Sequence, residues 1–125
     1  MRVNIVRRDI ERYMTALSEM DDGTLIARFV FPEKFAGFQG HFPSHKVLPG
    51  VCQIMCVKFM FEKSASRPVV LKEIVSAKFI SPVSPLEEIT CVCRNNIGNG
   101  HERTLKASIS KANSKVSEIK LKVIV

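Results

Sequence analysis

Aromatic side chains that could stack on nucleic-acid bases are scarce in this sequence. It has no tryptophan and one tyrosine among 125 residues, and its eight phenylalanines fall in the apolar pattern of a core. Because single-stranded nucleic acid is bound by basic grooves lined with stacking aromatics, we expect no nucleic-acid partner. Long apolar runs are also absent, since none reaches the ~18 residues that a membrane span needs. We therefore expect no membrane association.

Cysteine is sparse and unevenly spaced. The four cysteines are Cys52, Cys56, Cys91 and Cys93. They lie in apolar segments without the dense spacing of a secreted disulfide scaffold, so we expect reduced core thiols in a cytoplasmic protein. Neither Cys-x₃-Cys nor Cys-x-Cys has the usual loop spacing of a zinc site, and we expect no metal and no cofactor.

Residues 1–10 carry arginines but no apolar stretch after them, so we expect no signal peptide.

Positive charge exceeds negative charge. The chain has 19 Lys and Arg against 12 Asp and Glu, a net charge of +7. Residues 1–65 contribute 9 basic and 7 acidic groups, whereas residues 66–125 contribute 10 and 5. An acidic partner would be attracted to the second half. A solvated surface with no partner explains the same excess, and both interpretations stay open.

The length and the hydrophobic pattern predict one domain over residues 1–125. Helical spacing predicts a helix over residues 8–20 that ends at the Asp-Asp-Gly of residues 21–23. We therefore expect an N-terminal helical segment over residues 1–23 and a core over 24–125. Residues 24–31 alternate between apolar and polar side chains, which predicts a half-buried strand.

The centre of the chain predicts a buried helix followed by strands. A Pro-Gly pair opens residues 49–61, which are apolar nearly all round, so we expect other elements to enclose this helix. Period-two alternation and turn residues then predict antiparallel strands within residues 69–80, 89–93, 105–109 and 119–125. The fold class is therefore α+β, with a curved antiparallel sheet wrapped around a central buried helix.

Two short motifs resemble a known family. Residues 38–43 read Phe-Gln-Gly-His-Phe-Pro, and residues 47–51 read Val-Leu-Pro-Gly-Val. Together with Ala-Lys-Phe at residues 77–79, they resemble the β-hydroxyacyl-ACP dehydratases of fatty acid synthesis over residues 24–125. The resemblance implies a hotdog fold. It also implies a homodimer, or a higher oligomer of dimers, with an acyl tunnel at the subunit interface.

The resemblance assigns roles to residues of both motifs. It implies that His41 is the base that removes the α-proton of a 3-hydroxyacyl thioester, since histidine has a suitable pKa. The backbone around Gly50 and Val51 would polarise the thioester carbonyl, because a helix N-terminus presents free N–H groups. The acyl chain, carried on acyl carrier protein or CoA, would lie against apolar side chains: Phe42, Leu48, Met55 and Phe59.

The sequence departs from the family at one catalytic position. The family has a Glu or Asp fourteen residues after the histidine, where this chain has Met55, and Phe59 stands where many members have Gln. Of the nearest polar groups, Gln53 cannot titrate, and Glu62 is too far along the helix to substitute. Whether the chain is an enzyme therefore stays uncertain.

Three functions remain open. The first is a (3R)-hydroxyacyl-ACP dehydratase-like hydro-lyase of fatty acid or related acyl-chain biosynthesis. The second is a non-catalytic dehydratase-like subunit that binds acyl-ACP, and the third is a hotdog thioesterase. Thioesterases of this fold also usually need a carboxylate near the helix start, which the segment 51–61 lacks. The other histidines are weaker candidates, because His45 occupies a variable loop position and His101 lies at an expected hairpin tip.

Overall fold

A computed structural model describes residues 3–38 and 46–125 of the chain. Its elements, in chain order, are α1 (Val3–Tyr13), β1 (Met14–Glu19), β2 (Leu25–Val30), the short 3-10 helix η1 (Ala36–Phe38), α2 (Gly50–Ala65), β3 (Val70–Phe79), β4 (Glu88–Ile97), β5 (Glu102–Lys111) and β6 (Ser114–Ile124). No helix in these ranges is long and apolar enough to cross a membrane.

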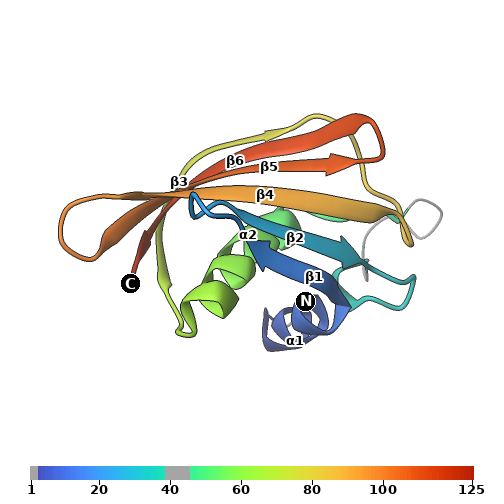
Figure 1. Ribbon diagram of the computed structural model, residues 1–125. Coiled ribbons are helices and arrows are strands. Elements are labelled where there is room, and N and C mark those ends of the chain that lie inside the picture. Colours follow the sequence, from blue (N-terminus) through green and yellow to red (C-terminus); the bar gives the residue numbers. More distant parts are fainter. Residues whose placement is uncertain (1–2, 39–45) are drawn as a thin grey trace.

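The six strands form one antiparallel sheet in the order β1-β2-β4-β5-β6-β3. Figure 1 shows the sheet curving over α2, with α1 beside α2 below the β1–β2 edge. The predicted α+β class is confirmed, and the strands expected after the central helix are present. The sheet has one strand more than the sequence predicted, because β1 joins it.

Inward-facing side chains of the sheet pack against α2. On β4, for example, Ile89, Cys91 and Cys93 are buried while the residues between them face solvent, the period of two expected of a half-buried strand. All four cysteines are free and buried, as predicted. Burial raises the pKa of Cys52 to about 11 and that of Cys93 to about 12, so these thiols stay protonated core residues.

The predicted N-terminal helix is wrong beyond Tyr13. The helix ends there, and residues 14–19 form β1, which pairs with β2. The apolar residues Ile10, Tyr13, Met14 and Leu17 have helical spacing, which suggested a helix. In β1 itself, Met14 and Leu17 are half-buried. The register shifts between Met14 and Ala16, so a local irregularity breaks the period of two that marks a strand. Pairing with the free edge of β2 outweighs the local pattern.

The strand β3 lies at the other edge of the sheet, and in the described chain it pairs with β6 alone. The strand predicted over residues 69–80 is therefore present. Its apolar side chains are nevertheless exposed: Ile74 and Phe79 are each 48% accessible, and Val75 is 38% accessible. Alternation correctly predicted a strand here, but the described residues cover its inner face only in part.

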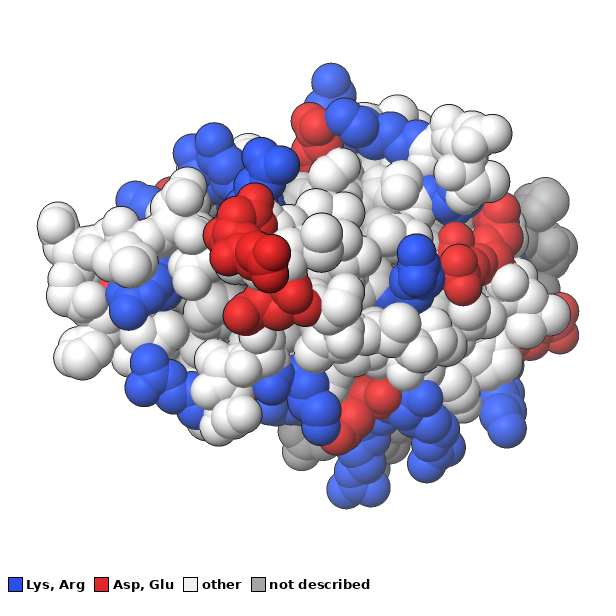
Figure 2. Space-filling view, viewed as in Figure 1, with Lys and Arg blue, Asp and Glu red and all other residues white. Residues whose placement is uncertain are grey.

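Charged side chains are dispersed over the face shown in Figure 1. Figure 2 shows Lys and Arg mainly along the margins of this face, with clusters of Asp and Glu between them. A broad continuous basic surface of the kind that binds a nucleic-acid backbone is not formed on this side.

Candidate functional site

The central helix α2 begins without a side-chain cap. Pro49 precedes it in an extended conformation, with φ −61° and ψ 150°. The carbonyl of Pro49 accepts hydrogen bonds from the N–H groups of Cys52 and Gln53. The first N–H groups of a helix have no partner within it and carry partial positive charge. Those of Gly50 and Val51 are therefore suited to binding an oxygen with partial negative charge.

A hollow of about 220 Å³ lies at this end of α2. It is lined by Val47, Leu48, Gly50, Gln53, Phe79, Ile80, Ser81 and Pro82. The walls are mostly apolar, with a few polar groups, as in many small-molecule sites. The volume is below the roughly 300 Å³ at which ligand pockets usually begin. One protomer thus presents a small, mostly apolar hollow at the start of α2.

Gly50 allows an aromatic ring to lie directly on the first turn of α2. A Cβ atom at this position would come within 2.6 Å of Cζ of Phe79, closer than real Cβ contacts permit. Only glycine therefore accommodates the ring where it lies. The contact joins the start of the helix to the end of β3, so the two form one wall of the hollow.

Gln53 connects the segment before α2 to the sheet. It is 3% exposed; its Nε2 donates to the carbonyl of Leu48 at 3.4 Å, and its Oε1 accepts from the hydroxyl of Ser117 at 2.7 Å. Ser117 is fully buried at the start of β6. The amide is thus engaged on both sides and acts as a structural link. The sequence drew attention to Gln53, but its partner lies 64 residues away and carried no signal.

The predicted acyl contacts on α2 lie on one face, four residues apart. Val51 is 51% exposed, Met55 is half-buried, and Phe59 is 8% exposed. Met55 and Phe59 pack on the core, whereas Gly50 and Leu48 line the hollow. Exposure on this face therefore decreases from Val51 at the helix start to Phe59 further along.

Two of the predicted site residues, His41 and Phe42, lie outside the described residues, as does His45. The segment that follows them is described from Lys46 onward and enters the wall of the hollow at Val47. The roles of His41 and Phe42 therefore stay predictions.

The buried carboxylate on α2 belongs to a different region. Glu62 is 6% exposed and accepts hydrogen bonds from Arg7 at 3.2 Å, from Lys58 at 3.2 Å and from the backbone N–H of Val69 at 2.8 Å. These contacts fix α1 and the start of β3 to α2. Since both carboxylate oxygens are used, Glu62 is a structural group, in agreement with its distance from position 55.

Comparisons with known proteins identify relatives of this arrangement. The family model described as ApeI-like, ApeI dehydratase, matches residues 17–120. No curated protein matches the chain. The dehydratase heterocomplex ApeI:P from Xenorhabdus doucetiae has a chain with 20% identity and a TM-score of 0.73; the match covers 90% of this chain and 96% of that one.

Two further solved structures are similar. The PaaI protein of E. coli, from the phenylacetic acid degradation operon, has 12% identity and a TM-score of 0.71, covering 98% of this chain and 88% of its own. The fluoroacetyl-CoA thioesterase FlK has 11% identity and a TM-score of 0.65, covering 81% and 83%. At these identities the likeness shows the fold, and the predicted hotdog architecture is confirmed.

Proposed function

Since the chain belongs to the ApeI-like dehydratase family, we propose that it is a (3R)-hydroxyacyl thioester dehydratase-like protein of acyl-chain biosynthesis. The observation that carries this proposal is the hollow at the start of α2, where free N–H groups meet apolar walls. A thioester carbonyl at Gly50 would be polarised by these donors. Its acyl chain would extend along the apolar wall formed with Phe79.

His41 acts as the base in this proposal. Its imidazole takes the proton from the α-carbon, the released electron pair forms the double bond, and the 3-hydroxyl leaves as water after gaining a proton. The last proton needs a donor, and the thioether of Met55 has none. Since general acid catalysis contributes typically 10²- to 10⁴-fold, the homomer should dehydrate its substrate slowly.

A non-catalytic role is the second candidate, and Met55 is the observation that favours it. A subunit of this kind would bind an acyl thioester or pair with an active homologue while leaving elimination to the partner. The thioesterase alternative has less support, because the first turn of α2 contains no acidic residue. An acyl carrier protein as the donor of the acyl group, and a cytoplasmic location, are also parts of the proposal.

Dimerisation through β3 would complete the site. Ile74 and Phe79 on this edge strand are about half exposed, and Val51 beside them is 51% exposed. Exposed apolar edges are normally paired or covered, and the hollow of one protomer is small for an acyl chain. A second copy joined at β3, as the family resemblance implies, would enlarge the hollow into a tunnel.

Hydration of a trans-2-enoyl thioester, the reverse reaction, tests the proposal. The assay compares wild type with Met55→Glu and His41→Ala, using both carrier-protein and CoA thioesters. We expect weak wild-type turnover, an increase in Met55→Glu, and none in His41→Ala. Binding is measured separately with a saturated acyl thioester.

Two outcomes would contradict this proposal. Absence of any thioester binding would remove the acyl-binding role itself. Full wild-type turnover that survives Met55→Ala but is lost in His41→Ala would show that another group supplies the proton. Binding without turnover, even in Met55→Glu, would favour the non-catalytic subunit.

A further inference from the structure

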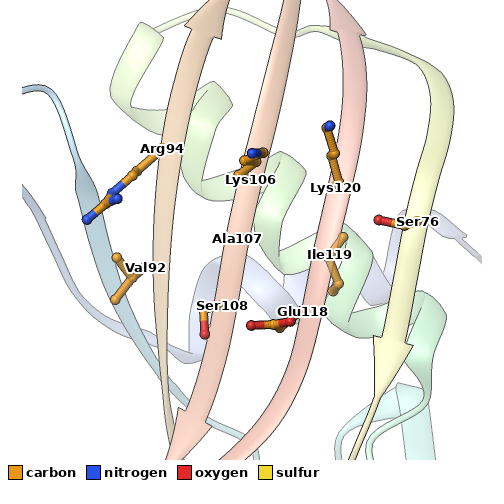
Figure 3. Close-up of a pocket in the computed structure, with 9 residues that line it drawn as sticks. All are labelled: Ser76, Val92, Arg94, Lys106, Ala107, Ser108, Glu118, Ile119 and Lys120. Carbon is orange, nitrogen blue, oxygen red and sulfur yellow. The ribbon is translucent and has the colours of Figure 1, made fainter.

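A second, larger hollow lies on the solvent face of the sheet, on the side away from α2. Its volume is about 460 Å³, within the usual range for small-molecule sites. Figure 3 shows its lining, which comes from four strands: Ser76, Val92, Arg94, Lys106, Ala107, Ser108, Glu118, Ile119 and Lys120. This hollow plays no part in the proposed thioester chemistry.

Three basic residues form a row across this hollow. The sheet register places Arg94 opposite Lys106, and Lys106 opposite Lys120, on the neighbouring strands β4, β5 and β6. Adjacent strands are only about 4.8 Å apart, and like charges directly opposite each other destabilise a sheet. The row therefore costs stability unless an anion neutralises it.

Most other lysines on this sheet have carboxylate partners. Lys72 contacts Glu102 at 2.7 Å, and Lys115 contacts Glu118 at 2.7 Å. The described ranges contain all 12 acidic residues of the chain, and in them neither Lys106 nor Lys120 forms an ion pair.

The two acidic groups nearest the row are engaged elsewhere. The hydrogen bond from Lys115 holds the pKa of Glu118 below its ordinary value, so this carboxylate is charged and paired with Lys115, although it lines the hollow. Arg94 extends away from the two lysines in Figure 3. Hydrogen bonds from Thr24, with a smaller effect of the Arg94 charge, lower the pKa of Asp22. Lys106 and Lys120 are thus left as a pair without a counter-ion.

We propose that this hollow binds a small molecule carrying a diphosphate group, with the two phosphoryl groups held by Lys106 and Lys120. Each ammonium group offers three donors in charge-assisted hydrogen bonds. The hydroxyls of Ser76 and Ser108 border the same space and add neutral donors. Val92 offers an apolar surface to the part of the bound ligand beyond its diphosphate group. Two phosphoryl groups match two opposed lysines, whereas a single carboxylate would neutralise only one.

Calorimetric titration of the purified full chain tests this site. The probes are inorganic pyrophosphate and ADP, applied to wild type, Lys106→Gln, Lys120→Gln and the double variant. Lys63→Gln is the matched control, because Lys63 is an exposed lysine on α2, on the opposite side of the sheet. Cooperative thermal unfolding in each variant, with a midpoint no lower than that of wild type, confirms that the fold is retained.

We expect saturable binding by wild type and by Lys63→Gln. Each substitution in the hollow should weaken binding roughly tenfold, the usual effect of losing a charge-assisted hydrogen bond. Binding of pyrophosphate alone identifies a free diphosphate, and binding of both probes identifies one attached to a nucleoside. Failure of wild type to bind either probe would overturn the proposal, as would equal binding by the double variant.

Discussion

The two ends of α2 differ in how they are held. At its end, Glu62 connects three elements through three hydrogen bonds, and the last residue before the chain turns, Ser66, adopts a left-handed conformation with φ 58°. At its start, Val51 and Phe79 are about half exposed, and a hollow lies between the helix start, the end of β3 and the segment before α2. The helix is thus anchored where it stops and accessible where it begins. Rigidity at one end supports binding at the other.

Removing the anchor should have the largest effect on stability. In Glu62→Ala, the N–H of Val69 and the amino group of Lys58 lose their acceptor in a buried setting. We expect a loss of about 3 kcal/mol in the free energy of unfolding, reduced somewhat because Arg7 is half exposed. Urea denaturation measures the change. Glu33→Ala, in an exposed loop, is the control and should stay within about 0.5 kcal/mol of wild type.

Breaking the Gln53 link should have the next largest effect. Gln53→Leu leaves the buried hydroxyl of Ser117 without its acceptor, and we expect a loss of about 2 kcal/mol in unfolding free energy. Adding Ser117→Ala removes the unpaired hydroxyl and should recover part of the loss. Strictly additive losses in this double-mutant cycle would show that the two side chains are not coupled.

Filling the space above the first turn of α2 should lower the unfolding free energy by a smaller amount. Gly50→Ala forces the half-exposed ring of Phe79 to move, and we expect a loss of about 1 kcal/mol together with weaker acyl thioester binding. The pair Gly50→Ala with Phe79→Ala makes room for the methyl group. If Gly50→Ala lowers the unfolding free energy in the Phe79→Ala background as much as it does in wild type, contact with the ring does not cause the loss.

A charge on the open edge should change assembly more than protomer stability. Ile74→Lys places an amino group on β3 at a position that is 48% exposed among the described residues. We expect the unfolding free energy to change by less than about 0.5 kcal/mol, while light scattering reports a monomer in place of a dimer. A wild-type monomer at micromolar concentration would contradict dimerisation, and Lys78→Glu on the outer face serves as a charge-change control.

The sequence predicted most of the fold because its local patterns agree with the tertiary structure. The period-two alternation around Cys91 and Leu105 matches buried positions of β4 and β5. The pattern failed at β1, where an irregular register left Met14 and Leu17 as its half-buried apolar residues. With Ile10 and Tyr13 before them, these residues have the spacing of a helix, and pairing with the edge of β2 determines the strand.

The site was predicted in part, for a similar reason. The Pro-Gly motif marked the start of α2, which the structure places at the hollow beside Leu48 and Gly50. Phe79 and Ser117 were missed, because each reaches the helix start from a strand distant in the sequence. The opposed lysines of the outer face depend on strand register, which a single sequence does not specify until the strands are paired.

The order of strands also determines when the chain can complete its sheet. The strand β3 is synthesised before β4, β5 and β6, yet it pairs with β6 alone in the described chain. During translation β3 therefore waits with both edges unpaired until the last strand has left the ribosome. A nascent or truncated chain that ends before Ser114 would present Ile74 and Phe79 along a free backbone, the kind of segment that chaperones protect and that otherwise aggregates. Within the protomer, the β3–β6 pairing can therefore form only after β6 has been synthesised.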